Sequence, residues 1–123
     1  MTVNEAIARC DEMIGDNCGR EAKLRWLSDV ESMLYQEIIC THEGFYERKN
    51  WRPFCADDGE RELLAQDPYG ELYVFYLMMR SHLLLQDMNQ YNNAAALFAS
   101  SYTSFADWYN RTHMPLSVGD IIL

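Results

Sequence analysis

The side chains with the most evident chemistry in this chain are four cysteines and three histidines. A structural zinc ion would need convergent ligands such as Cys40, His42, Cys55 and His113. Zinc motifs usually supply their ligands in closely spaced pairs, and here only Cys40 and His42 are close in sequence. None of the four cysteines belongs to a CxxC motif. We therefore expect no bound metal, and reduced thiols that lie in or near the core as small apolar side chains.

Catalysis would need a nucleophile, an acid or a base in a recognisable arrangement. The sequence has no GxSxG motif, no phosphate-binding loop and no glycine pattern for a dinucleotide. No nucleophile is paired by sequence with His42, His82 or His113, and His82 lies among leucines, as a hydrogen-bonded core or interface histidine does. Glu60 and Glu62 lie in a charged segment typical of a solvated turn. These features predict no enzyme, no catalytic residue and no cofactor.

The charge balance argues against two classes of partner. The chain has 123 residues and carries 19 acids against 10 bases, a net charge of −9. A general nucleic-acid-binding protein needs a basic surface to neutralise phosphates, and anionic membranes attract basic proteins. The N-terminus lacks the pattern of a signal peptide, and the longest apolar run, 72–85, is too short and interrupted to span a bilayer. The composition favours one soluble, intracellular globular domain.

Two helices are predicted in the first third of the chain. A capping-box pattern at 2–5 begins a helix over 3–14. A second helix is predicted over 20–40, where charged residues such as Lys23 and Glu31 would lie outside the apolar stripe. That stripe consists of Leu24, Leu27, Val30, Met33, Leu34 and Ile38. The pattern is typical of a helix with one buried face.

The segment at about 45–66 lacks a helical period. It is predicted to form an irregular insertion or a short β-hairpin, in which 51–55 would pair with 62–65 around a turn at 55–59. Pro53 would allow only an edge strand. Because long loops in small domains are often functional, this segment is a candidate contact region.

A helical hairpin is predicted in the second half of the chain. Its first helix would begin with Asp67 as the N-cap and Pro68 at the first helical position. That helix is apolar almost all round, so it must be covered on nearly every side, either by the chain itself or by another subunit. A turn at 86–90 leads to a helix over 90–112. The apolar positions of that helix are Tyr91, Ala94, Phe98, Tyr102, Phe105 and Tyr109.

Together these elements predict a mainly α fold, a small bundle of about four helices. We expect a single helical domain over 1–123. The first two helices would occupy 1–44, the loop or β-hairpin insertion 45–67, the helical hairpin 68–112 and an extended tail 113–123.

Charge is distributed unevenly along the chain. Most acids lie in residues 1–66, whereas the stretch 72–112 carries only Arg80, Asp87, Asp107 and Arg111. The hairpin is rich in Tyr, Trp, Phe, Met and Arg, which are enriched at the cores of protein interfaces. We predict an oligomer or partner interface at Tyr73, Tyr76, Arg80, Trp108 and Tyr109. The alternative is that these aromatic residues serve the core of a single chain.

Four segments of the sequence carry a resemblance to a known group of proteins. They are Ile39–Gly44, Asp67–Tyr73, Tyr91–Phe98 and Trp108–Pro115. Together they resemble a family of small proteins encoded among the head-morphogenesis genes of tailed phages and prophages of Gram-positive bacteria. That family is similar to the head–tail connector, or adaptor, proteins. One departure is 87–90, which stands where the family pattern would place a glycine-containing turn.

The resemblance implies a structural role in the virion. Connectors of this kind are helical, assemble as a ring beneath the portal protein and join the filled capsid to the tail. The implied partners are further copies of the chain, the portal protein and a tail-side completion protein. DNA would pass through the ring without specific binding, and an acidic lumen would keep it from adhering. The implied location is the neck of the virion, and the host cytoplasm before assembly, with no membrane contact.

Two other classes of function remain open from the sequence. An acidic helical regulatory protein would occupy the basic site of a partner, as a DNA mimic does. An enzyme with an unrecognised site would gather His82 or a cysteine with carboxylates in a deep pocket.

Overall fold

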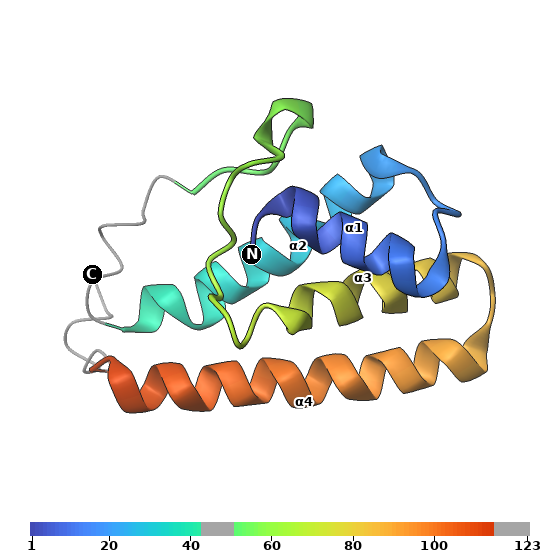
Figure 1. Cartoon of the computed structure of the whole chain (residues 1–123). Coiled ribbons are helices and arrows are strands. Elements are labelled where there is room, and N and C mark those ends of the chain that lie inside the picture. The colour runs from blue at the N-terminus through green and yellow to red at the C-terminus, as the bar shows by residue number, and fades with distance from the viewer. Residues whose placement is uncertain (43–50, 115–123) are drawn as a thin grey trace.

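The computed structural model describes residues 1–42 and 51–114, and the structural statements below concern these residues (Figure 1). They form α1 (Val3–Ile14), α2 (Arg20–Glu37), η1 (Ile39–Thr41), η3 (Ala56–Asp58), α3 (Glu71–Leu84) and α4 (Met88–Thr112), where η denotes a 3-10 helix. The prediction of a mainly α-helical small bundle is confirmed.

Helix α3 lies at the centre of the bundle. Helices α1 and α2 pack against it from one side, and the long α4 runs beside it on the other (Figure 1). Its residues Leu72, Tyr73, Val74, Leu77 and Ser81 are all buried. The chain itself therefore buries one side of this helix, whereas Phe75, Tyr76, Met78 and Met79 are only partly buried, so cover from another subunit stays a prediction. Its C-terminal end differs, because Leu83, Leu84 and Leu85 are 45%, 60% and 51% exposed.

The first two helices lie close to their predicted bounds. Helix α1 begins and ends as expected, and the Thr2 hydroxyl caps it by accepting a hydrogen bond from the Glu5 N–H (3.2 Å). Helix α2 ends at Glu37, three residues before the predicted end, and η1 continues the chain. The shorter, tighter turn at its C-terminus is common where an α-helix ends.

The segment 51–70 contains no β-hairpin, so that alternative of the prediction is wrong for the described residues. In place of the predicted turn at 55–59, residues 56–58 form η3, and the Asp58 carboxylate accepts a hydrogen bond from the N–H of its N-cap, Cys55 (2.8 Å). Residues 59–63 pair instead with the N-terminus: Asn4 N–H donates to Gly59 O, Val3 N–H to Arg61 O, and Leu63 N–H to Met1 O. The partner of this segment is therefore nearly 60 positions away in sequence.

Helix α3 begins later than predicted, at Glu71, so Asp67 is not its N-cap. The preceding residues form a turn in which the Tyr69 N–H donates to Gln66 O (2.9 Å). Hydrogen bonds between residues three positions apart continue into the start of the helix, where the Tyr73 N–H donates to Gly70 O (3.1 Å). The regular hydrogen bonding of α3 begins after this turn. Pro68 therefore lies in the turn before the helix and is not its first residue.

The corner between α3 and α4 is a Schellman motif without glycine. The Asp87 N–H donates to His82 O (2.9 Å) and the Gln86 N–H to Leu83 O (3.1 Å), which is the hydrogen-bond pair that defines this motif. Gln86 has a φ of 61°, in the left-handed region that glycine usually supplies. Asp87 then caps α4 by accepting a hydrogen bond from the Gln90 N–H (3.2 Å). The corner is sharp, and it requires the unfavourable left-handed backbone conformation of Gln86.

We predict that Gln86→Gly stabilises the protein. A left-handed conformation costs a residue with a Cβ about 1–2 kcal/mol, which glycine avoids while it adds flexibility to the unfolded chain. The net expectation is a gain of about 0.5–1 kcal/mol in the free energy of unfolding, measured by urea denaturation. Gln90→Gly in the first turn of α4 is the control, and it should cost about 0.5–1 kcal/mol. Equal losses in both variants would contradict the prediction.

Candidate interaction surfaces

Two charged side chains that were expected on the polar face of α2 are buried. Lys23 and Glu31 are each 1% exposed. The expectation fails because α2 packs against α1 and α3 and also against the segment 63–65, so more than one of its faces is covered. Buried charges are rare in proteins unless they are paired or hydrogen-bonded, and both of these are.

Lys23 fastens α1 and the following turn to α2. Its ammonium group forms ion pairs with Asp11, on α1, and with Asp16 (2.8 Å). Burial opposes the positive charge, but the two carboxylates outweigh that effect and raise the pKa of Lys23 above its ordinary value. The hydrogen bond from Lys23, together with one from the Gly19 N–H, lowers the pKa of Asp16.

Glu31 joins three elements in the interior. Its carboxylate accepts a hydrogen bond from the Tyr73 hydroxyl on α3 (2.5 Å) and one from the Leu64 N–H (2.7 Å). The Tyr73 oxygen in turn accepts a hydrogen bond from the Ala65 N–H (2.8 Å). Burial raises the pKa of Glu31 to about 7, even though these hydrogen bonds and the nearby Arg61 favour the charged form.

This environment makes the stability of the protein depend on pH between about 4.5 and 7. The folded chain holds a proton on Glu31 that the unfolded chain, with the ordinary pKa of 4.5, has already released. The contribution of Glu31 to stability is therefore present at low pH and is lost as the pH rises through this range. Over the whole range, the loss in the free energy of unfolding is on the order of 3 kcal/mol.

We predict that Glu31→Gln removes this pH dependence, because the amide does not ionise. The difference in free energy of unfolding between the variant and the parent should shift by about 2–3 kcal/mol in favour of the variant between pH 5 and pH 8. Chemical denaturation at a series of pH values measures it. Glu21→Gln, an exposed change on the same helix, is the control and should leave the profile unaltered. A parallel profile for Glu31→Gln would show that Glu31 does not titrate in this range.

The five residues predicted to form an interface fall into two groups. Tyr73 and Tyr109 are 0% and 4% exposed, so in this conformation they pack inside the chain. Tyr76, Arg80 and Trp108 are partly exposed. Only this second group offers surface to a partner.

Arg80 and its neighbours form a cation–aromatic cluster between α2 and α3. The guanidinium lies over the Trp26 ring (5.5 Å to the centroid) and donates a hydrogen bond to the Tyr76 hydroxyl (3.0 Å). It also lies 3.8 Å from the carboxylate of Asp29. Tyr76 packs edge-on against Phe98 of α4. The cluster holds Arg80 in a defined position while part of its side chain remains accessible.

Aromatic rings gather near the C-terminal end of α4. The Tyr109 ring is stacked on His113 (3.8 Å between centroids) and meets the edge of His42 (4.8 Å). The His42 ring nitrogens lie 2.6 Å from Ile38 O and 2.6 Å from the Asn110 amide oxygen. Trp108 packs against Phe105 and against Tyr69, which precedes α3. Sequence spacing identified the α4 members of this cluster, but not His42.

The structure distributes the candidate metal ligands over separate places. His42 and His113 lie on either side of Tyr109, whereas the Cys55 thiol contacts Asp58 (3.2 Å) in η3. Within the described parts of the chain, no three His, Cys, Asp or Glu side chains converge as metal ligands would. The four cysteines are free thiols, and burial raises the pKa of Cys10 to about 11.

His82 is not a core histidine, and the alternative of an interface histidine stays a prediction. It is only partly buried, and its Nδ1 has no hydrogen-bond partner among the described residues.

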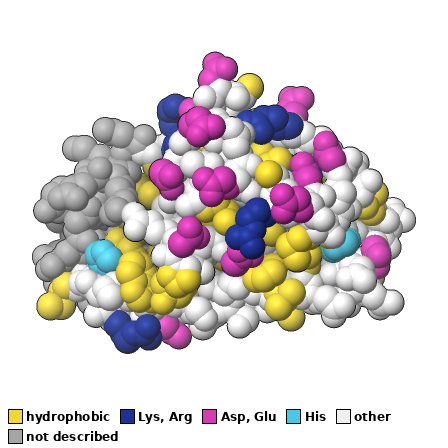
Figure 2. All heavy atoms as spheres, in the orientation of Figure 1, with side chains coloured by type: hydrophobic (Ala, Val, Ile, Leu, Met, Phe, Trp, Pro, Cys, Tyr) yellow, Lys and Arg dark blue, Asp and Glu magenta, His cyan; other side chains and the backbone are white. Residues whose placement is uncertain are grey.

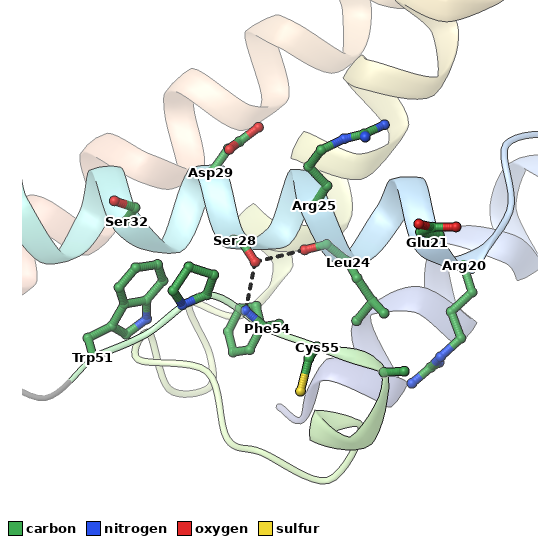
Figure 3. A pocket seen from close by; sticks show the side chains of 12 residues that line it. Arg20, Glu21, Leu24, Arg25, Ser28, Asp29, Ser32, Trp51, Phe54 and Cys55 are labelled. Carbon is green, nitrogen blue, oxygen red and sulfur yellow. Dashed lines mark hydrogen bonds between the residues drawn. The ribbon is translucent and has the colours of Figure 1, made fainter.

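A groove runs along α2, opposite the segment 51–56 (Figure 3). Its volume is about 760 Å³, within the range of ligand-binding clefts. Residues of α2 and residues 51–56 face each other across it, and Ser28 ties the two sides by accepting a hydrogen bond from the Phe54 N–H (2.8 Å). The lining residues are Arg20, Glu21, Leu24, Arg25, Ser28, Asp29, Ser32, Trp51, Pro53, Phe54, Cys55 and Ala56. No local pattern in the sequence predicts this groove, because it joins segments that are distant along the chain.

Charge is segregated on the surface as it is along the sequence. Acidic side chains, with a few Lys and Arg side chains among them, spread over the upper part of the view in Figure 2, above α3, whereas the lower edge along α4 carries few charges. Within α4 the only charged residues are Asp107 and Arg111. Its exposed residues are mainly small or uncharged: Asn92, Asn93, Ala96, Ala99, Ser100, Thr103 and Ser104.

Comparison with known proteins found no match to a family model, a curated protein or a solved structure. Among residues 1–42 and 51–114, no helix has the length and apolarity needed to cross a membrane.

Proposed function

We propose that the protein is a structural subunit of a phage virion, a head–tail connector that assembles as a ring between the portal protein and the tail. The observation that carries the proposal is the segregation of charge. The acidic surface suits a channel wall that repels DNA phosphates, and the nearly uncharged outer face of α4 suits contact with another subunit. The helical fold and the segments that resemble the family also support it.

The contacts between subunits would use the exposed side chains of the helical hairpin. Tyr76, Arg80 and Trp108 are the aromatic and arginine positions that remain accessible, and these residue types are enriched at interface hot spots. Contacts to neighbouring rings would use the segment 45–66 and the tail 113–123, parts of which lie outside the described residues.

A first test is the genomic neighbourhood of the gene. Flanking portal, terminase and capsid genes would support a connector, and an isolated gene beside regulators would contradict it. The biochemical test mixes the purified protein with the portal protein from the same genome and examines it by light scattering and negative-stain microscopy. A ring of this kind can form only when the portal is present as a template, so a monomer of the isolated protein is compatible with the proposal.

We predict that Ala99→Glu prevents ring formation on the portal. The substitution places a charge in the middle of the uncharged outer face of α4, where a neighbouring subunit would have to desolvate it. Ala8→Glu, the same change at an exposed position of α1, is the matched control and should leave assembly intact. Both variants should unfold at nearly the same denaturant concentration as the parent.

Two outcomes would contradict the connector. One is the absence of both a ring and portal binding at micromolar concentration. The other is assembly that is equally sensitive to Ala99→Glu and Ala8→Glu. Tight binding of a monomer to a basic protein would instead favour the acidic regulatory alternative.

A further inference from the structure

None of the residues that line the groove between α2 and the segment 51–56 belongs to α4, the helix whose outer face we assign to contacts between subunits. One wall of the groove does belong to the segment 45–66, which we assign to contacts with neighbouring rings. Its α2 side runs from Arg20 to Ser32, which corresponds to about 18 Å at 1.5 Å per residue. An extended chain advances about 3.3 Å per residue, so the length matches five or six extended residues. A compact small molecule would fill only part of it.

The apolar floor of the groove is formed before any ligand binds. Leu24 and Phe54 are 7% and 8% exposed, and the Trp51 ring packs against Phe54 and against Tyr35. Arg61 places its guanidinium over the Phe54 ring (4.4 Å). A fixed apolar surface of this kind can accept a large apolar side chain without first ordering itself.

The wall opposite α2 is held by a network centred on Asp58. The Arg52 guanidinium donates two hydrogen bonds to the Asp58 carboxylate (2.8 and 2.9 Å), and this pairing lowers the pKa of Asp58 well below its ordinary value. The same carboxylate accepts the Cys55 N–H, and Ser28 accepts the Phe54 N–H. The wall is therefore fixed at Phe54 and at Cys55.

One end of the groove carries a cation that is available for a ligand. The Arg20 side chain extends from α2 towards the end of the 51–56 segment (Figure 3). It is exposed and has no ion pair with any described residue. Three other charged residues line the groove: Asp29, which lies 3.8 Å from Arg80, and the exposed Glu21 and Arg25. In a chain of net charge −9, most other surfaces repel a carboxylate.

We propose that this groove binds an extended segment of a partner protein, in which large apolar side chains lie next to a carboxylate. The apolar side chains would occupy the floor at Leu24, Phe54 and Trp51, and the carboxylate would pair with Arg20. Buried apolar contact supplies the affinity, and the position of Arg20 at one end of the groove sets the direction in which the segment lies.

The test uses a library of random seven-residue peptides displayed on phage and selected on the whole protein. We expect the enriched peptides to share an aspartate or glutamate beside aromatic or large aliphatic residues. Their binding should fall at least tenfold in Ala56→Trp, which fills the groove from an exposed position, and in Arg20→Glu. Binding of synthetic copies should also shift the fluorescence of tryptophan and slow alkylation of the exposed Cys55 thiol.

Matched controls separate the groove from the rest of the surface. Ala8→Trp and Arg111→Glu are the same changes at exposed positions elsewhere, and both should bind the peptides like the parent. Peptides that bind all variants equally, that lack the acid, or that are not enriched at all would overturn the proposal. Self-association that is lost only in Ala56→Trp would also overturn it, in favour of a second copy of the chain. None of these results depends on ring formation with the portal.

Discussion

The carboxylate of Glu31 is the interaction on which the arrangement of the bundle depends. It reaches from α2 to the hydroxyl of Tyr73 on α3 and to the backbone of Leu64. Burying a carboxylate is costly, and it is tolerated here because both oxygens accept short hydrogen bonds and because the group can hold a proton near neutral pH. Removing the acid would leave the Leu64 N–H without its acceptor, which costs more than an ordinary hydrogen bond is worth.

Lys23 and Glu31 give α2 its role as the scaffold of the molecule. They lie eight positions apart on one helix, and each binds a different neighbour. Lys23 holds α1 and the turn that follows it, whereas Glu31 holds α3 and the segment 63–65. That segment continues from η3 and the wall of the groove, so the position of the groove follows from the same contacts.

The sequence predicted the parts of the fold that depend on local periodicity. Helix α1, most of α2 and the aromatic face of α4 have patterns and caps that act within a few residues. Contacts between distant positions could not be predicted in this way. The pairing of residues 59–63 with the N-terminus, the burial of Lys23 and Glu31, and the groove beside Trp51 all join segments whose proximity no local pattern encodes. Charged residues on a helix are usually solvated, so their ordinary interpretation was wrong here.

The two proposed surfaces make different physical demands on a partner. The outer face of α4 is long and almost uncharged, so a second subunit could cover it without burying unpaired charges. The groove is lined by apolar residues together with four charged ones, and the unpaired Arg20 lies at one end, so we propose that it selects a short segment by side-chain type and direction. Because α4 packs on one side of α3 and α2 on another, occupation of one surface need not obstruct the other. Under the two proposals, the chain would bind its own copies through α4 while it receives a segment of a different protein through α2.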